Sequence, residues 1–337
     1  MTFSAGMLNL LGGLPLAREG SFWFPPEASS FAPGVDLTFH FILWTCVVFF
    51  VGICGTTGYF VWKYRKRPGH KEQKTSTHNL ILEATWSFAP LMLLMVMFGM
   101  STYWYYQMIT PPKDEQVYDI TVRGQKWRWA FKYSGDPFDK LYQTPKLHVI
   151  KGQAYRLIMD SPDVIHSMYL PAFRVKQDCV PGRYNKLWFR PTMAGEFDLF
   201  CTEYCGNDHS LMITKVVVHE DANSWRDAII ETGDVTRIED LLARGQAIFE
   251  QNCTSCHTLD GSAKVGPSFK GIWGKTEQFE DGSSHVVDEE YVRESITTPA
   301  KHIVKGYPNS MTPFDFGPER EKYYDGIFAL LKSLKDK

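Results

Sequence analysis

Two short strings of this chain combine thiols with imidazoles at spacings typical of metal sites. The first, Cys201–Met212, has the pattern C-x-E-x-C-x-x-x-H-x-x-M. Soft sulfur together with imidazole suits copper, although a C-x-x-x-C pair taken alone also suits zinc. His166 lies upstream, where a loop between two strands would return it to the same end of a sheet; alone, it or Met212 is also explained as a core residue. We predict one metal centre from these side chains: His166, Cys201, Cys205, His209 and Met212.

The second string, Cys253-Thr254-Ser255-Cys256-His257, has the pattern C-x-x-C-H, which attaches c-type haem. In such a site two thioethers hold the porphyrin and the adjacent histidine ligates the iron. A zinc half-site or a thiol–disulfide pair is the alternative. Zinc would need a second Cys/His pair of regular spacing, and only the unpaired His285 and His302 follow nearby. The string therefore predicts covalently bound haem with His257 as the proximal ligand.

The elements that position these strings begin with two membrane spans. The chain has 337 residues, of which 44% are hydrophobic and 22% are charged, so it is not disordered. Its net charge of -2 argues against nucleic-acid binding. Residues 37–62 and 84–109 contain no Asp, Glu, Lys or Arg, and each is long enough to cross a bilayer. The segment 63–79 between the spans is rich in Lys and Arg. The positive-inside rule therefore predicts that this loop lies in the cytoplasm and that both termini lie outside. Residues 1–16 are apolar but lack the basic start of a signal peptide.

Beyond Pro111-Pro112 the pattern changes to short strands and then to helices. Gly and Pro separate the predicted strands, which indicates a small β-sandwich or barrel. They cover 117–122, 127–133, 146–150, 155–160, 186–190, 196–200 and 213–219. Apolar residues at helical spacing then predict helices over 234–252 and 319–335. The expected parts are an external segment 1–36, a two-helix hairpin 37–110, a β domain 111–219, a linker 220–233 and a helical domain 234–337.

The first string is where the chain resembles a known family. Residues 36–219, including Asp178-x-x-Pro181-Gly182-Arg183, resemble subunit II of the haem–copper cytochrome c oxidases. The resemblance implies a cupredoxin-like sandwich that carries the binuclear copper centre CuA. In that centre the two cysteines each bridge both coppers and the two histidines each bind one copper. Met212 would be a weak ligand of one copper, and the backbone carbonyl of Glu203 a weak ligand of the other.

The same resemblance implies three further roles. The carboxylate of Glu203 would help to hold a magnesium ion at the boundary with subunit I. Trp127 would be the residue through which electrons enter from an external cytochrome c, although a strand aromatic packed in the core is the alternative; Arg128 departs from the aromatic residue common beside it. Glu83 would lie at the mouth of a proton path into subunit I, although a carboxylate at headgroup level is the alternative.

Residues 234–337 resemble a class I cytochrome c. Gly266-Pro267 is similar to the segment beside the proximal histidine, and Asn309–Phe314 is similar to the segment that carries the distal methionine. The resemblance implies haem c bound by Cys253, Cys256, His257, Pro267 and Met311. Met311 would be the sixth iron ligand, with core packing as the alternative, and His302 is the rival ligand. The acidic segment 277–294 is expected to be a solvated insertion or a docking surface.

The whole chain therefore resembles subunit II of a caa-type oxidase, with a mixed fold: two N-terminal transmembrane helices, a cupredoxin-like β-sandwich and an all-α cytochrome c domain. The resemblance implies that electrons pass from haem c to CuA and on to subunit I, where dioxygen is reduced to water with proton translocation. Implied partners are subunits I and III, a cytochrome c or quinol:cytochrome c reductase donor, and the membrane.

The implied location is the bacterial inner membrane, with both termini and both metal domains periplasmic. The linker 220–233 would tether donor to acceptor. Two other functional hypotheses stay open. One is a CuA-containing electron-input subunit of a nitric oxide or nitrous oxide reductase, and the other is a membrane-anchored electron carrier without an oxidase.

Overall fold

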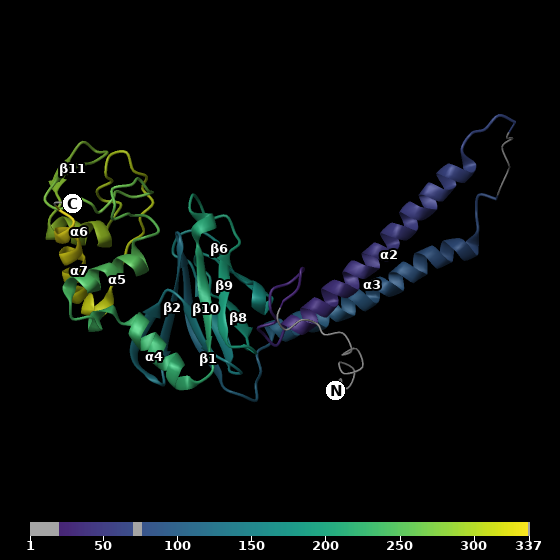
Figure 1. Ribbon diagram of the computed structural model, residues 1–337, viewed down its shortest axis with the longest axis horizontal. Coiled ribbons are helices and arrows are strands. Elements are labelled where there is room, and N and C mark those ends of the chain that lie inside the picture. The colour runs from purple at the N-terminus through teal and green to yellow at the C-terminus, as the bar shows by residue number, and fades with distance from the viewer. Residues whose placement is uncertain (1–19, 70–75, 336–337) are drawn as a thin grey trace.

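The computed structural model describes residues 20–69 and 76–335 and has an elongated shape built from three parts in chain order (Figure 1). A helical hairpin forms one end, a β-sandwich lies in the middle, and a helical domain forms the other end. The apolar segment 1–16 and part of the basic loop, 70–75, lie outside the described residues.

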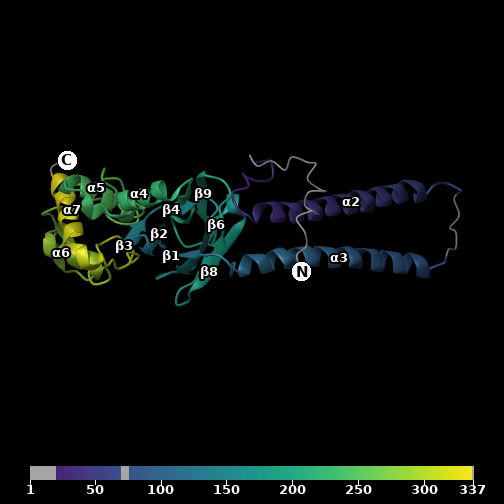
Figure 2. The same cartoon turned by 90° about the horizontal axis from the view of Figure 1, so that it is seen from below.

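The hairpin consists of α2 (Ala32–Tyr64) and α3 (Leu80–Ile109), which run side by side in both views (Figure 2). Their most apolar windows have mean hydropathies of 2.2 and 1.8 and are not buried within the chain. Helices of 33 and 30 residues exceed the length that crosses a bilayer. The two predicted spans are confirmed, and each helix is longer than its uncharged segment.

The hairpin is fixed directly to the sandwich. Arg174 makes a bidentate ion pair with Asp36 near the start of α2, with both nitrogen–oxygen distances 2.8 Å and both side chains buried. Trp188 donates its indole N–H to the Gln107 carbonyl near the end of α3, at 3.0 Å. Because a paired, hydrogen-bonded charge tolerates burial, Asp36 lies inside α2 without breaking it. The sandwich therefore sits at a defined place above the membrane end of the hairpin.

The sandwich contains two five-stranded sheets. The first has the order β3-β2-β1-β5-β8, formed by Phe138–Thr144, Arg128–Gly135, Val117–Gln125, Ala154–Asp160 and Asn185–Phe189. The second has the order β4-β10-β9-β6-β7, formed by Leu147–Ile150, Ile213–His219, Gly195–Cys201, His166–Leu170 and Val175–Cys179. Inward side chains alternate along β1, where Ile120 and Val122 are buried, as a sheet with one face on the core requires.

The predicted sandwich is confirmed, but β3, β6 and β7 were missing from the predicted strands. β3 shows three exposed residues in a row, which hides the alternation of buried and exposed side chains. β6 is buried almost throughout and carries His166, which the sequence placed in a turn. In both cases the register with neighbouring strands, rather than the local pattern, decides the structure.

Residues 220–233, expected to be a linker, form helix α4 (Ala222–Gly233) instead. Asp221 caps the helix by accepting hydrogen bonds from the backbone N–H groups of residues 223 and 224. Trp225 and Ile229 are buried in the sandwich core, and the Trp225 indole donates to the His148 carbonyl at 3.1 Å. The expected linker is therefore a helix docked on the sandwich.

The C-terminal domain runs from η3 (Val235–Arg237) to α7 (Arg320–Ser333). Between them lie α5 (Leu241–Asn252), the hairpin β11–β12 (Thr276–Gln278 and Ser284–Val286), α6 (Glu289–Thr297) and η4 (Gly317–Glu319). A Cβ atom on Gly245 would lie 2.1 Å from the Gly326 carbonyl oxygen, so glycine permits the close crossing of α5 and α7. Phe279, Tyr291 and Val292 are buried, so the acidic segment 277–294 is part of the fold and not a solvated insertion.

Candidate metal centres

Neighbouring strands of the second sheet bring the first metal-ligating string together with His166. β6 begins at His166 and pairs with β9, which ends at Cys201. The loop after β9 carries Cys205, and η2 (His209–Leu211) turns the chain back before β10. Ligand atoms of His166, Cys201 and Cys205 all lie within 4.8 Å of one another. The residues that the sequence separated by 35 positions therefore share one end of the sandwich.

The other expected copper ligands lie around the same thiols. The Sγ atoms of Cys201 and Cys205 are 3.8 Å apart. Cys205 Sγ lies 3.4 Å from His209 Nδ1 and 4.0 Å from Met212 Sδ. Cys201 Sγ lies 3.4 Å from the Glu203 carbonyl oxygen. Two imidazoles, a thioether and a carbonyl thus lie around the pair of thiols, and soft donors of these kinds fit copper.

Neighbouring polar groups hold the ligands in place. Asp163 Oδ1 lies 2.9 Å from His166 Nε2, and a carboxylate behind a histidine fixes the ring orientation of a metal ligand. The other ring nitrogen, His166 Nδ1, is buried and finds no hydrogen-bond partner within 20–69 and 76–335. A buried polar atom without a partner is costly, so this nitrogen fits the position of a metal ligand.

The two thiols differ in acidity. Burial raises the pKa of Cys201, but the neighbouring His166 imidazole and the Ser167 backbone outweigh it and lower the pKa below its ordinary value. Burial and the neighbouring Cys201 raise the pKa of Cys205. Since a metal binds thiolates and releases protons, metal binding at this pair depends on pH.

Trp127 does not have the exposure that a docking residue requires. Its side chain is only 6% exposed, and its indole N–H donates to the Cys205 carbonyl at 3.1 Å. Cys256 and Val265 of the C-terminal domain pack against the same core cluster. We therefore correct the expectation of an exposed tryptophan for an external cytochrome c: Trp127 is buried against the copper loop and lines a pocket at the boundary with the C-terminal domain.

Of the two expected carboxylate sites, Glu203 is exposed and Glu83 is half-buried. Glu203 presents its side chain to solvent beside the copper loop. Glu83 lies in the first turn of α3, where its Oε1 accepts a hydrogen bond from the Asn79 backbone N–H at 3.1 Å. Asn79 in turn accepts from the Leu82 N–H at 3.1 Å. Glu83 thus has a capping role at the helix N-terminus, which the sequence analysis did not assign to it.

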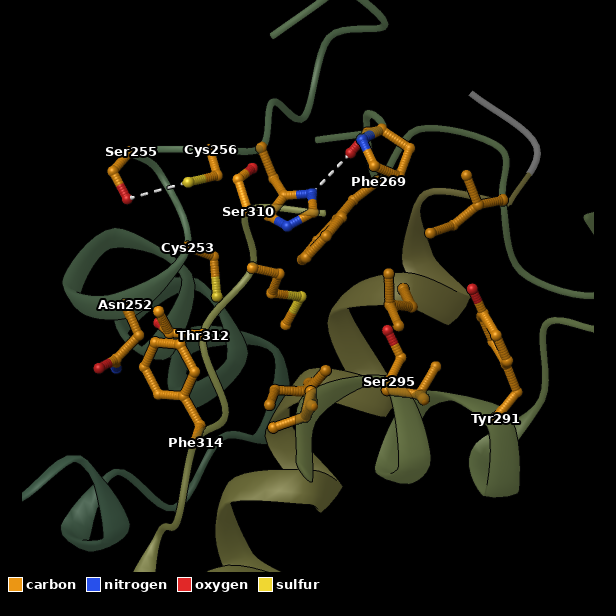
Figure 3. A pocket seen from close by; sticks show the side chains of 18 of the residues that line it. Asn252, Cys253, Ser255, Cys256, Phe269, Tyr291, Ser295, Ser310, Thr312 and Phe314 are labelled. Atoms are coloured by element: carbon orange, nitrogen blue, oxygen red, sulfur yellow. Dashed lines mark hydrogen bonds between the residues drawn. The ribbon is translucent and has the colours of Figure 1, made fainter. Parts of the chain in front are cut away.

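The second string lines a cavity in the C-terminal domain that is partly open to solvent. Figure 3 shows Cys253, Thr312 and Phe314 on one side of this cavity and Tyr291 and Ser295 on the opposite side. His257, Pro267 and Met311 also line it. Apolar side chains dominate the rest of the wall, as a porphyrin requires; they are Phe269, Ile272, Val287, Val292, Ile296, Phe316, Ile327 and Leu331.

The surroundings of His257 fit an iron ligand. Its Nδ1 donates to the Pro267 carbonyl at 2.7 Å, which leaves Nε2 as the ligating atom. A Cβ atom on Gly266 would lie 2.5 Å from His257 Cε1, so only glycine admits the ring here. Burial lowers the pKa of His257, which favours the neutral imidazole that binds a metal. The residues present therefore fit a haem with two thiols, one histidine and one methionine.

Two residues of the sandwich also line this cavity, and the sequence analysis did not assign them to it. Lys126 and Arg128 reach it from the turn between β1 and β2. The only sequence signal was the departure at Arg128 from the aromatic residue common at that place. Contacts between two domains leave no pattern in the local sequence. The contribution of Lys126 and Arg128 to the cavity therefore follows only from the three-dimensional structure.

Three family models match this chain. They are "Cytochrome C oxidase subunit II, transmembrane domain" over residues 17–102, "Cytochrome C oxidase subunit II, periplasmic domain" over 141–220, and "Cytochrome c" over 242–317. Together they cover the hairpin, much of the sandwich and most of the C-terminal domain, in the order that the fold shows.

Curated relatives have the same description. A cytochrome c oxidase subunit 2 from Alkalihalophilus pseudofirmus is 28% identical over 287 residues, which are 81% of this chain and 79% of the relative. An alternative cytochrome c oxidase subunit 2 from Bradyrhizobium diazoefficiens is 26% identical over 65% of this chain and 88% of the relative. The solved periplasmic domain of oxidase subunit II from Bradyrhizobium japonicum is 29% identical over 37% of this chain and 99% of its own, with a TM-score of 0.32. The chain thus combines the transmembrane and periplasmic domains of cytochrome c oxidase subunit II with a cytochrome c domain fused on their C-terminal side.

Proposed function

We propose that this chain passes electrons from a covalently bound haem c to CuA and on to subunit I of a cytochrome c oxidase. When bound, the haem and the copper pair each take up and release one electron. The observation that carries the proposal is that both ligand sets lie in one chain, with Trp127 and Arg128 between them. The contribution of the protein is to hold the two sites dry, fixed and adjacent.

The proposed copper ligands act through positions set by the sandwich. Cys201, Cys205, His166 and His209 would be the main ligands of the copper pair. Met212 and the Glu203 carbonyl would be its weaker ligands. Asp163 keeps the His166 ring oriented, and burial of the thiols excludes water. Ligand loops held by a rigid sheet change little between redox states, which favours fast electron transfer.

The proposed haem ligands come from loops of the C-terminal domain. Cys253 and Cys256 would attach the porphyrin through thioethers, and His257 and Met311 would hold the iron. Pro267 accepts the hydrogen bond that orients His257. Met311 is supported as a ligand because it lines the cavity. His302, the rival ligand, does not line this cavity, and its Nε2 lies 3.6 Å from Glu294.

Two roles concern the boundary with subunit I. The exposed carboxylate of Glu203 would contribute to a magnesium site there, because a hard cation prefers carboxylate oxygen. Glu83 would stand at the mouth of a proton path while also capping α3. In this proposal Trp127 keeps its place on the electron route but receives electrons from the fused domain.

The proposed setting is the bacterial inner membrane, with the basic loop in the cytoplasm and both metal domains on the periplasmic side. The charge of the 63–79 loop supports this orientation. Subunit III is a further proposed partner, and the donor to haem c would be a cytochrome c or a quinol:cytochrome c reductase.

The test is gas consumption by the purified complex supplied with reduced cytochrome c. We expect dioxygen uptake, and we expect the variant Cys205→Ser to abolish it. Cys179→Ser is the matched control, since Cys179 is a buried cysteine of the same sandwich outside the proposed ligands. Uptake of nitric oxide without dioxygen uptake, or a chain that purifies without any haem–copper subunit, would overturn the proposal.

A further inference from the structure

The turn between β1 and β2, Gln125–Arg128, is the place where the sandwich enters the haem cavity. Lys126 and Arg128 line that cavity, while its other lining residues belong to the C-terminal domain. The turn is therefore part of the sandwich in sequence and part of the haem pocket in space.

On the haem side, this turn contacts both segments that are proposed to hold the iron. Arg128 donates from one guanidinium nitrogen to Asn252 Oδ1 at 3.2 Å, and Asn252 immediately precedes Cys253. The guanidinium carbon lies 4.5 Å from the centre of the Phe314 ring. Gln125 Nε2 donates to Thr312 Oγ1, next to Met311. One turn thus contacts both the segment beside Cys253 and the segment beside Met311.

Arg128 and Gln125 also support each other. The second guanidinium nitrogen of Arg128 donates to Gln125 Oε1 at 3.2 Å. The planar fork of arginine suits this bridging between two acceptors, whereas a lysine ammonium offers only a single flexible donor point. The two side chains therefore act as one unit across the domain boundary.

On the copper side, the same turn is tied to two proposed ligands. The backbone N–H of Lys126 donates to Asp163 Oδ2 at 2.8 Å, and Asp163 Oδ1 lies 2.9 Å from His166 Nε2. The Trp127 indole donates to the Cys205 carbonyl at 3.1 Å. Four consecutive residues thus connect the haem pocket to the copper loop by hydrogen bonds.

The charge of Arg128 is placed where it acts on the haem. Burial lowers its pKa to about 10, so the guanidinium remains charged at neutral pH. Its side-chain hydrogen-bond partners within the described part of the chain are the neutral amides of Asn252 and Gln125. A half-buried cation beside the haem favours the redox state with one more electron, because that state carries less positive charge.

We propose that Arg128, with Gln125, is a positioning residue that docks the haem pocket onto the copper loop and whose charge raises the reduction potential of haem c. The inference rests on the proposed function. In the step it serves, one electron leaves the ferrous haem, which is oxidised, and reduces the copper pair; no bond breaks and no proton moves.

Two variants separate the charge from the docking. Arg128→Gln keeps a side chain able to hydrogen-bond but removes the charge. At a fixed potential near the midpoint, we expect its ratio of reduced to oxidised haem to fall about tenfold, the order of a unit charge acting over about 10 Å at an effective dielectric of about 20. Arg128→Lys keeps the charge but loses the forked guanidinium. We therefore expect the reduction potential of haem c to stay the same and the contact between the two domains to weaken.

The measurements use the whole complex. Redox titration of the haem absorbance reports the potential, and hydrogen–deuterium exchange reports the docking of 252–256 and 309–314. We expect a lower potential in Arg128→Gln and faster exchange in Arg128→Lys. Arg156→Leu is the matched control, since Arg156 is an arginine of the same sandwich that pairs with Asp119 at the surface.

Equal potentials in Arg128→Gln and Arg156→Leu, together with unchanged exchange in Arg128→Lys, would overturn the inference. Failure of the proposed function gives a different result, because the parent complex would then itself lack the haem or the copper absorbance. The titration also needs no dioxygen uptake, so it stands apart from turnover.

Discussion

The two metal centres of this chain are built in opposite ways. The proposed copper ligands gather at one end of the sandwich, where His166, Cys201 and Cys205 lie within 4.8 Å of one another. The proposed haem ligands instead line an apolar pocket of the C-terminal domain. We therefore expect the sheets to fix the copper ligands through their own packing, and the haem to form part of the hydrophobic core of the C-terminal domain.

The largest expected effect is loss of the haem attachment. In the double variant Cys253→Ser with Cys256→Ser, we expect the C-terminal domain to lose its protection from hydrogen exchange, because the apolar wall of the pocket would no longer be covered by the porphyrin. The copper signal should remain. Ser255→Ala, between the two cysteines, is the control. A C-terminal domain that stays protected from hydrogen exchange without haem would show that its fold does not depend on the cofactor.

Removal of copper should have a much smaller effect on folding. Chelation, or the variant Cys201→Ser, is expected to abolish copper binding while β6 and β9 keep their hydrogen-exchange protection. The loss of bound metal lowers stability through mass action only, by about 4 kcal/mol at a thousandfold excess over the dissociation constant. Thermal unfolding of the sandwich measures this. A sandwich that unfolds without copper would show that both sites depend on their metal in the same way.

The folding stability of the sandwich should decrease in acid because of one buried histidine. Burial, and then the nearby His219, lower the pKa of His148 from its ordinary value to about 4. His148 Nδ1 lies 3.0 Å from His219 Nε2, and Lys146 adds positive charge nearby. The unfolded chain therefore binds a proton at a higher pH than the folded one does, so stability is present above about pH 6.5 and is lost as the pH falls towards about 4.

This acid sensitivity is worth about 3 kcal/mol. His148→Leu should remove most of the pH dependence of sandwich unfolding in that window, as measured by denaturant titration. The partly exposed His219 should contribute less, which His219→Gln measures. An unchanged pH profile in His148→Leu would show that other groups control the acid stability of the sandwich.

The smallest expected effect lies at the joint between the two domains. Lys140 of β3 pairs with Asp234 at 2.8 Å and with Glu319 at 3.5 Å. Because the lysine is partly exposed, we expect Lys140→Met to cost less than about 1 kcal/mol. Hydrogen exchange of Val235–Arg237 should quicken slightly. Separation of the domains in this variant would mean that the joint, and not the turn at Arg128, holds them together.

Most of the fold was predictable because long and regular patterns carried it. The uncharged runs predicted both spans, and Gly and Pro between short apolar runs predicted the sandwich. The missing strand β6 shows the limit: its residues are buried on both faces, so the alternation that marks a strand is absent. Helix α4 was taken for a linker because only the burial of Trp225 and Ile229 in another element reveals it as docked.

The site was predictable to the extent that its chemistry is local. Cysteine and histidine spacing pointed to both metal-binding strings, and the structure brings the proposed copper ligands together. Trp127 was expected to be exposed, since nothing in its own segment shows that the C-terminal domain covers it. The contacts of Arg128 with Asn252 and Gln125 likewise depend on how two domains dock.

The central claim is that one chain holds a coupled copper pair and a covalent haem side by side. Electron paramagnetic resonance of the oxidised, purified complex tests it most directly, together with the haem absorbance of the same sample. The account predicts one unpaired electron shared equally by two copper nuclei in material that also contains covalent haem c. A signal from a single copper nucleus, or haem iron without any copper signal, would contradict it.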